Sequence, residues 1–74
     1  MSNNDIGNNA GVIWRLLEEY GVMSINEIEK YTLMQQTNIF LALGWLARES
    51  KINFFVKDGV LHVELIHTSF KYYF

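Results

Sequence analysis

Asp58-Gly59 joins two segments in which polar and apolar residues alternate, and no other part of the chain narrows the choice of fold as much. Asp-Gly between such segments is a strong signal for a type I′ hairpin turn, because both central positions of that turn require a positive φ. Pairing outward from the turn places residues 52–57 opposite residues 60–65. The sequence therefore predicts a two-stranded antiparallel hairpin.

The pairing sorts the side chains of the hairpin into one apolar face and one mostly polar face. Side chains alternate between the faces with a period of two, so a slip of one residue would mix them. The register is therefore well specified. The apolar face carries Ile52, Phe54, Val56, Leu61, Val63 and Leu65, and the other face carries Asn53, Phe55, Lys57, Val60, His62 and Glu64.

A first helix is predicted over residues 6–20, where apolar residues recur at helical spacing. Asn4 or Asp5 can cap its start, and Gly21 stands where it would end. The polar, Asn-rich residues 1–5 are expected to form a flexible leader. The helical domain thus begins at about residue 6.

Two more helices are predicted before the hairpin. Ser24 and Glu27 have the spacing of a capping box, which starts a short second helix. Thr32 and Gln35 repeat that spacing, so Thr32 is the expected cap of a third helix that runs to about Glu49 or Ser50. Three helices followed by a hairpin is the element order of a winged helix-turn-helix, an α+β fold.

The third helix lacks the polar face that a surface helix normally keeps. From Ile39 to Ala47 no side chain is polar. Helical spacing divides these residues into a set that packs inward and a set that faces outward. The inward set is Ile39, Leu43 and Leu46 with Ala42 and Ala47, and the outward set is Phe40, Leu41, Gly44 and Trp45.

Size and composition favour a single domain that is supplemented by a partner chain. A chain of 74 residues buries only about 60% of its unfolded surface and is marginal alone. It has no cysteine for a disulfide, yet 50% of its residues are hydrophobic and 15% are aromatic. We expect a domain over residues 6–66, an aromatic tail over residues 67–74, and a homodimer.

Charge and hydropathy indicate where the chain is located and which surfaces it is not expected to bind. A net charge of −2 disfavours non-specific attraction to nucleic acid or to an anionic membrane. The start of the chain lacks the pattern of a signal peptide, and its apolar runs are far shorter than the roughly 20 residues that span a bilayer. We therefore expect a cytoplasmic bacterial protein with no membrane contact.

No arrangement of residues typical of an enzyme is present. Glu18 and Glu19 are adjacent on a helix and diverge, so they are expected to be solvated charges. The chain has no nucleophile elbow, P-loop or dinucleotide glycine pattern. His62 and His67 have an odd spacing, which on one strand puts them on opposite faces and prevents a shared metal. We expect no catalysis, no cofactor and no metal.

Two motifs resemble those of a small, uncharacterised family of winged helix-turn-helix proteins from Bacteroides-type bacteria. They are "IGNNAGVIWRLL", with Ala10-Gly11 and Trp14, and "ALGWLARESKINF", with Gly44-Trp45 and Arg48-Glu49. The resemblance covers residues 6–65 and implies the fold. It implies no biochemical activity.

A winged helix-turn-helix can bind DNA by placing its third helix in the major groove and its wing on the backbone or in the minor groove. That use requires polar and basic side chains on the outer face of the helix. Each cation in this region has acidic neighbours in the sequence, so a solvated surface is the alternative reading. The candidate contacts are Gln35, Gln36 and Asn38 for bases, and Arg48, Lys51 and Lys57 for phosphates.

The outward residues of the third helix instead favour contact with protein, because an exposed apolar patch of that size is unusual on a monomer. A second copy, another protein or the aromatic tail would cover it. Trp14 and Trp45 are read as core and interface anchors. Gly7 and Gly11 share a helix face and either admit a neighbouring backbone or fray the first turns. The candidate interface is Gly7, Gly11, Phe40, Leu41, Gly44, Trp45, Phe70, Tyr72 and Tyr73.

The aromatic tail is expected to be ordered. Phe70, Tyr72, Tyr73 and Phe74 crowd its last positions, and burying such rings is strongly favourable. The expected receiving surface is Phe40 and Trp45 of the same chain or of the partner. The alternative is a disordered terminus.

Overall fold

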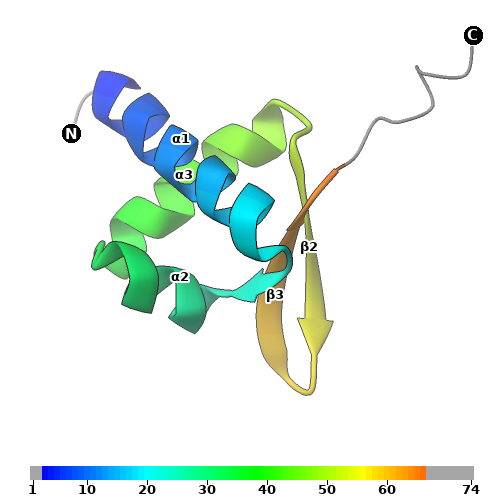
Figure 1. Cartoon of the computed structure of the whole chain (residues 1–74). Helices are drawn as coiled ribbons and strands as arrows, with labels where there is room; N and C mark the ends of the chain where they lie inside the picture. The colour runs from blue at the N-terminus through cyan, green and yellow to red at the C-terminus, as the bar shows by residue number, and fades with distance from the viewer. Residues whose placement is uncertain (1–2, 67–74) are drawn as a thin grey trace, which may run out of the picture.

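Three helices and a three-stranded antiparallel sheet make up the computed structural model, which describes residues 3–66 (Figure 1). The helices pack together on one side and the sheet extends away from them as the wing. The elements are α1 (Asn3–Tyr20), β1 (Met23–Ser24), α2 (Ile25–Thr32), α3 (Gln36–Arg48), β2 (Ile52–Lys57) and β3 (Val60–Leu65). The predicted winged helix-turn-helix is confirmed.

The hairpin has the predicted register, with Lys57 opposite Val60 next to the turn and Ile52 opposite Leu65 at the far end. Asp58 and Gly59 both have positive φ, 54° and 76°, as a type I′ turn requires. Beyond the strands, the Ile66 amide donates to the Lys51 carbonyl at 2.8 Å. The ladder therefore continues to the end of the described chain.

The sheet contains a third strand, β1, that is absent from the elements predicted from the sequence. β1 pairs with β3, placing Met23 opposite Val63 and Ser24 opposite His62, and the strand order is β1-β3-β2. A strand of two residues is too short to show the alternation from which strands are predicted. Its pairing puts β3 in the centre of the sheet.

The predicted capping box at the start of α2 is present. The Glu27 amide donates to Ser24 Oγ at 3.1 Å, and the Ser24 amide donates to Glu27 Oε1 at 2.8 Å. The bond from the Ser24 amide is the main reason that the pKa of Glu27 is lowered. Ile25 and Ile28 follow the cap and are buried, which fixes α2 against the core.

The starts of the predicted first and third helices need correction. α1 begins at Asn3, so residues 3–5 are helical and neither Asn4 nor Asp5 is its cap. Thr32 does not cap α3 but ends α2, where its hydroxyl donates to the Ile28 carbonyl at 2.7 Å. Leu33 then takes a left-handed conformation, and α3 starts at Gln36.

The core lies between the three helices and the base of the sheet. α1 packs chiefly on α3, and α2 and the base of the sheet complete the enclosure (Figure 1). Trp14, predicted as a core residue, is instead partly exposed. The buried core consists of Ala10, Ile13, Leu17, Met23, Ile25, Ile28, Ile39, Ala42, Leu43, Leu46, Ile52 and Val63.

Candidate interaction surface

α3 has an apolar outer face as well as an apolar inner face. The inward residues pack as predicted, with Ile39, Ala42, Leu43 and Leu46 buried. On the opposite side the exposed fractions are 47% for Phe40, 44% for Leu41 and 36% for Trp45. Within the described chain, these three large side chains remain open to solvent.

Gly44 stands in the middle of that outer face, and the described residues give no packing reason for it. A Cβ added at this position would meet no atom within 4 Å, and the backbone is ordinary helix. Glycine inside a helix costs about 1 kcal/mol relative to alanine. Gly44 thus leaves a shallow gap between large apolar side chains.

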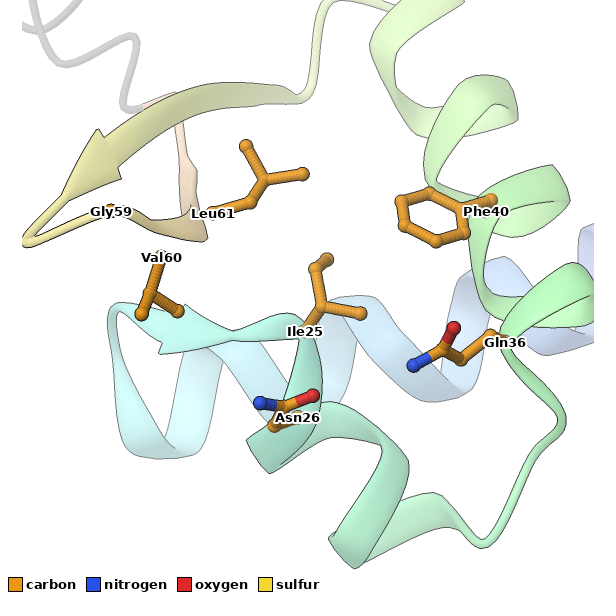
Figure 2. A pocket seen from close by; sticks show the side chains of 7 residues that line it. All are labelled: Ile25, Asn26, Gln36, Phe40, Gly59, Val60 and Leu61. Atoms are coloured by element: carbon orange, nitrogen blue, oxygen red, sulfur yellow. The ribbon is translucent and has the colours of Figure 1, made fainter.

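A groove of about 320 Å³ separates the start of α3 from the wing. Figure 2 shows the side chains of Phe40, Ile25 and Leu61 converging on it from α3, α2 and β3. The two amides Asn26 and Gln36 supply the polar part of the rim. Gly59 and Val60 close it at the wing tip, so one wall belongs to the helix and the other to the hairpin.

The apolar face of the hairpin extends this surface. Ile52 and Val63 are buried, whereas Phe54, which lies opposite Val63 on the edge strand, and Val56, closer to the turn, are 42% and 67% exposed. Alternation along the strands puts them on the face that carries Leu61. We define the α3–wing surface as Phe40, Leu41, Gly44, Trp45, Phe54, Val56 and Leu61.

The three wing residues of this surface were not among the predicted interface residues. The signal was present, because the register already placed Phe54, Val56 and Leu61 on one apolar face. The pattern did not show how far the helical layer reaches along the hairpin. In the structure, β3 is partly or fully buried from Leu61 to Leu65, whereas Ile52 is the one fully buried residue of β2.

The candidate DNA contacts are divided between two ends of the molecule. Gln35 and Gln36 are exposed at the start of α3, where Asn38 is half-buried, and Lys57 is exposed beside the wing tip. Gln36 and the wing tip line one groove. Arg48 and Lys51 lie at the other end of α3, roughly 20 Å away at 1.5 Å per residue.

Other aromatic residues lie outside the α3–wing surface. Lys51 Nζ is 5.7 Å from the ring centre of Trp14, which is within the range of a cation–π contact. Tyr20 and Tyr31 stack with centroids 4.9 Å apart. The negative charge of Glu19 is the main cause of the raised pKa of Tyr20. These pairs tie α1 to its neighbours.

Two candidate residues on α1 have open space around them. An added Cβ at Gly7 or at Gly11 would meet no atom within 4 Å. The described chain therefore places no backbone against them. Phe70, Tyr72, Tyr73 and Phe74 lie outside the described residues, as does the predicted docking of the tail.

His62 is held by its own strand and its neighbours. Its Nδ1 lies 2.8 Å from the Val60 carbonyl oxygen, and its ring stacks on Phe55 with centroids 5.5 Å apart. His67, the other histidine, lies outside the described residues. Between residues 3 and 66, no group of three or more metal-binding side chains comes together. Over the same range, no helix is long and apolar enough to cross a membrane.

Known proteins are similar to this chain in structure or in sequence. The solution NMR structure of protein BT2368 from Bacteroides thetaiotaomicron superposes with a TM-score of 0.79 at 31% identity, covering 100% of this chain and 87% of that one. Uncharacterized protein MJ1608 from Methanocaldococcus jannaschii is 46% identical over 56 residues, which are 72% of this chain and 77% of that protein. The chain is therefore similar to proteins from both of these organisms.

The family comparison agrees with the fold and with the motifs that first indicated it. Residues 1–65 match the family described as winged helix-turn-helix domain (DUF2582). The fold is in general that of a DNA-binding or regulatory module. The match spans all three helices and the wing, and the chain belongs to this winged helix-turn-helix family.

Proposed function

We propose that the chain is a non-catalytic protein-interaction module that acts as a homodimer in or near transcription regulation. Its interface is the α3–wing surface. The observation that carries the proposal is the exposure of Phe40, Leu41 and Trp45 on the helix that winged-helix DNA binders turn toward the groove. A cytoplasmic location follows from that role.

The side chains of this face support protein contact over DNA contact. Base edges and phosphates are bound by hydrogen-bond donors, acceptors and cations, which the middle of α3 lacks. Aromatic and large aliphatic side chains around a small residue are typical of the centre of a protein interface. Gly44 allows a second chain to approach the α3 backbone between Phe40 and Trp45.

A second copy is the partner that the properties of the chain favour most. The domain is small, has no disulfide, and leaves several large apolar side chains exposed. Association would bury that area and add stability to a chain whose size makes it marginal alone. A two-fold interface uses the same patch on both copies, and one apolar patch suffices for it.

Sedimentation equilibrium at tens of micromolar tests the proposal. We expect a dimer for the unmodified chain and a monomer for Leu41→Gln, which keeps helix propensity and removes an exposed apolar contact. The matched control is Val12→Gln, which changes an equally exposed residue on α1. A monomeric unmodified chain would rule out the homodimer. A dimer broken only by Val12→Gln would move the interface to α1.

A second candidate function is sequence-specific binding of double-stranded DNA as a transcription regulator. It is favoured by Gln36 and the wing tip lining one groove, with Lys57 next to the turn. Polarisation titrations with a pool of duplexes at several salt concentrations provide the test. DNA binding predicts an affinity that falls with salt, and Lys57→Gln should reduce the salt slope by about 1. Affinity for no duplex at low salt would exclude this function.

A further inference from the structure

The outer edge of β2 is unpaired over the described residues, because β3 lies in the centre of the sheet and β1 on its other side. A tight two-residue turn makes its flanking pair, Lys57 and Val60, a hydrogen-bonded pair. The bond from the Ile66 amide to the Lys51 carbonyl agrees with this, because hydrogen-bonded pairs recur at every second position and residues 51 and 66 are an even number of positions from Lys57 and Val60. Odd-numbered residues of β2 therefore direct their backbone groups at β3, and Ile52, Phe54 and Val56 direct theirs outward.

This edge lacks the devices that usually prevent one strand from pairing with another. Such devices are prolines, bulges, and charged side chains along the strand. The register of β2 with β3 runs without a bulge, and the strand contains no proline. Its one charge, Lys57, is at the tip. Phe54 and Val56, whose amides point outward, also carry the exposed apolar side chains.

We propose that β2 pairs antiparallel with β2 of a second copy, so that one sheet continues through both chains. This inference rests on the proposed homodimer and specifies how it is built. Backbone hydrogen bonds along the two edges would join the copies, and alternate side chains would supply the specificity. Because Phe54 and Val56 share a face with Leu61, the paired strands would extend the α3–wing surface of each copy into that of the other.

Charge selects the register of the pairing. Outward residues must oppose outward residues, so the two-fold axis passes through a residue and not between two residues. An axis at Phe54 would place Lys57 opposite Lys51 of the second copy, and opposed like charges are unfavourable. An axis at Phe55 instead places Phe54 opposite Val56 and Asn53 opposite Lys57 of the second copy. It pairs apolar with apolar and avoids the repulsion.

Amide hydrogen exchange of the full chain, followed by NMR over a dilution series, tests the pairing. We expect the amides of Phe54 and Val56 to be protected at concentrations where the dimer forms and to exchange rapidly on dilution. The amide of Phe55 faces β3 and is the internal control, protected in both states. In a mixed labelled and unlabelled dimer, a cross-peak between the α-protons of the two Phe55 residues fixes the axis.

Val56→Pro removes an outward donor, and edge strands tolerate proline where the N–H faces solvent. We expect it to lower the association constant by about tenfold or more, while Val56→Thr, which keeps the donor, lowers it less. A dimer in which Phe54 and Val56 amides stay unprotected overturns the strand pairing and leaves the proposed function intact. A chain that is monomeric at every concentration overturns both.

Discussion

At the scale of single residues, the wing turn depends on a conformation that few side chains accept. Gly59 has a φ of 76°, and a β-branched residue there meets the steric penalty of the left-handed region. We expect Gly59→Val to lower the free energy of unfolding by about 1–2 kcal/mol, measured by chemical denaturation. Asp58→Asn is the control, because asparagine tolerates positive φ. Equal stability of Gly59→Val and the unmodified chain would contradict a type I′ turn.

Leu33 is a second residue in the left-handed region, with a φ of 61° between α2 and α3. Its side chain is exposed, so the conformation is not repaid by burial. We expect Leu33→Gly to raise the free energy of unfolding by about 1 kcal/mol, less the entropy that glycine adds to the unfolded chain. Leu33→Val should lower it. The same denaturation series measures both, and a Leu33→Gly chain less stable than Leu33→Val would contradict backbone strain at this position.

The capping box should make the stability of the fold depend on pH. The Ser24 amide lowers the folded-state pKa of Glu27, so this carboxylate stabilises the fold above its unfolded pKa. The contribution is lost as pH falls through the lower, folded value. Thermal unfolding between pH 7 and pH 3 should show a loss of stability in acid that is smaller in Glu27→Gln. Identical pH profiles would mean that Glu27 is not coupled to folding.

Removing the cap itself has a separate effect. Ser24→Ala should cost about 1 kcal/mol at neutral pH, because the Glu27 amide loses the hydroxyl that accepts from it. Thr32→Val is the comparison at the other end of α2, because it removes the hydroxyl that donates to the Ile28 carbonyl there. Equal stability of Ser24→Ala and the unmodified chain would show that water replaces the cap.

At the scale of elements, α3 contains a conflict between its own stability and the proposed contact. An alanine at position 44 fits without any clash and favours the helix, so Gly44→Ala should stabilise the isolated fold by about 1 kcal/mol. The same methyl group would keep a second chain from approaching the α3 backbone. We expect higher resistance to denaturant in dilute solution and weaker self-association in sedimentation. Stronger or unchanged association would remove Gly44 from the interface.

The elements differ in how well the sequence predicts them, and the reason is physical. The Asp58-Gly59 turn and the Ser24–Glu27 cap are local, so sequence alone gives their geometry. β1 forms through pairing with a strand distant in the chain, and no local pattern encodes it. Thr32 has the spacing of a cap, but its hydroxyl satisfies α2 instead, and so the start of α3 was placed too early.

At the scale of the whole molecule, the sequence predicts the part of the apolar surface that lies on α3 but not the part that lies on the wing. Helical spacing identifies the outward residues of α3 from sequence, and the structure leaves Phe40, Leu41 and Trp45 exposed as expected. The contribution of the wing depends on where the helical layer ends relative to the hairpin. Phe54 and Val56 lie beyond it, a property of packing between elements that no single element reveals.

The aromatic residues after Thr68 provide another test at this scale. If Phe70, Tyr72 and Tyr73 cover the outer face of α3, a chain truncated after Thr68 should lose stability and change its association. Thermal unfolding and sedimentation of the truncated chain, next to the unmodified one, measure both. A truncated chain that keeps its stability and its oligomeric state would show that the tail does not dock and that another surface covers α3.

The burial of Trp45 in a dimer can be followed by ¹⁹F NMR of the 5-fluorotryptophan-labelled chain, diluted from millimolar to low micromolar concentration. Trp14 and Trp45 are the two tryptophans, and Trp14→Phe assigns their signals. Trp14, on α1 beside Lys51, is the internal reference. We expect the proposed dimer interface to move the Trp45 signal with dilution while the Trp14 signal stays in place. A Trp45 signal that is the same at every concentration would contradict it.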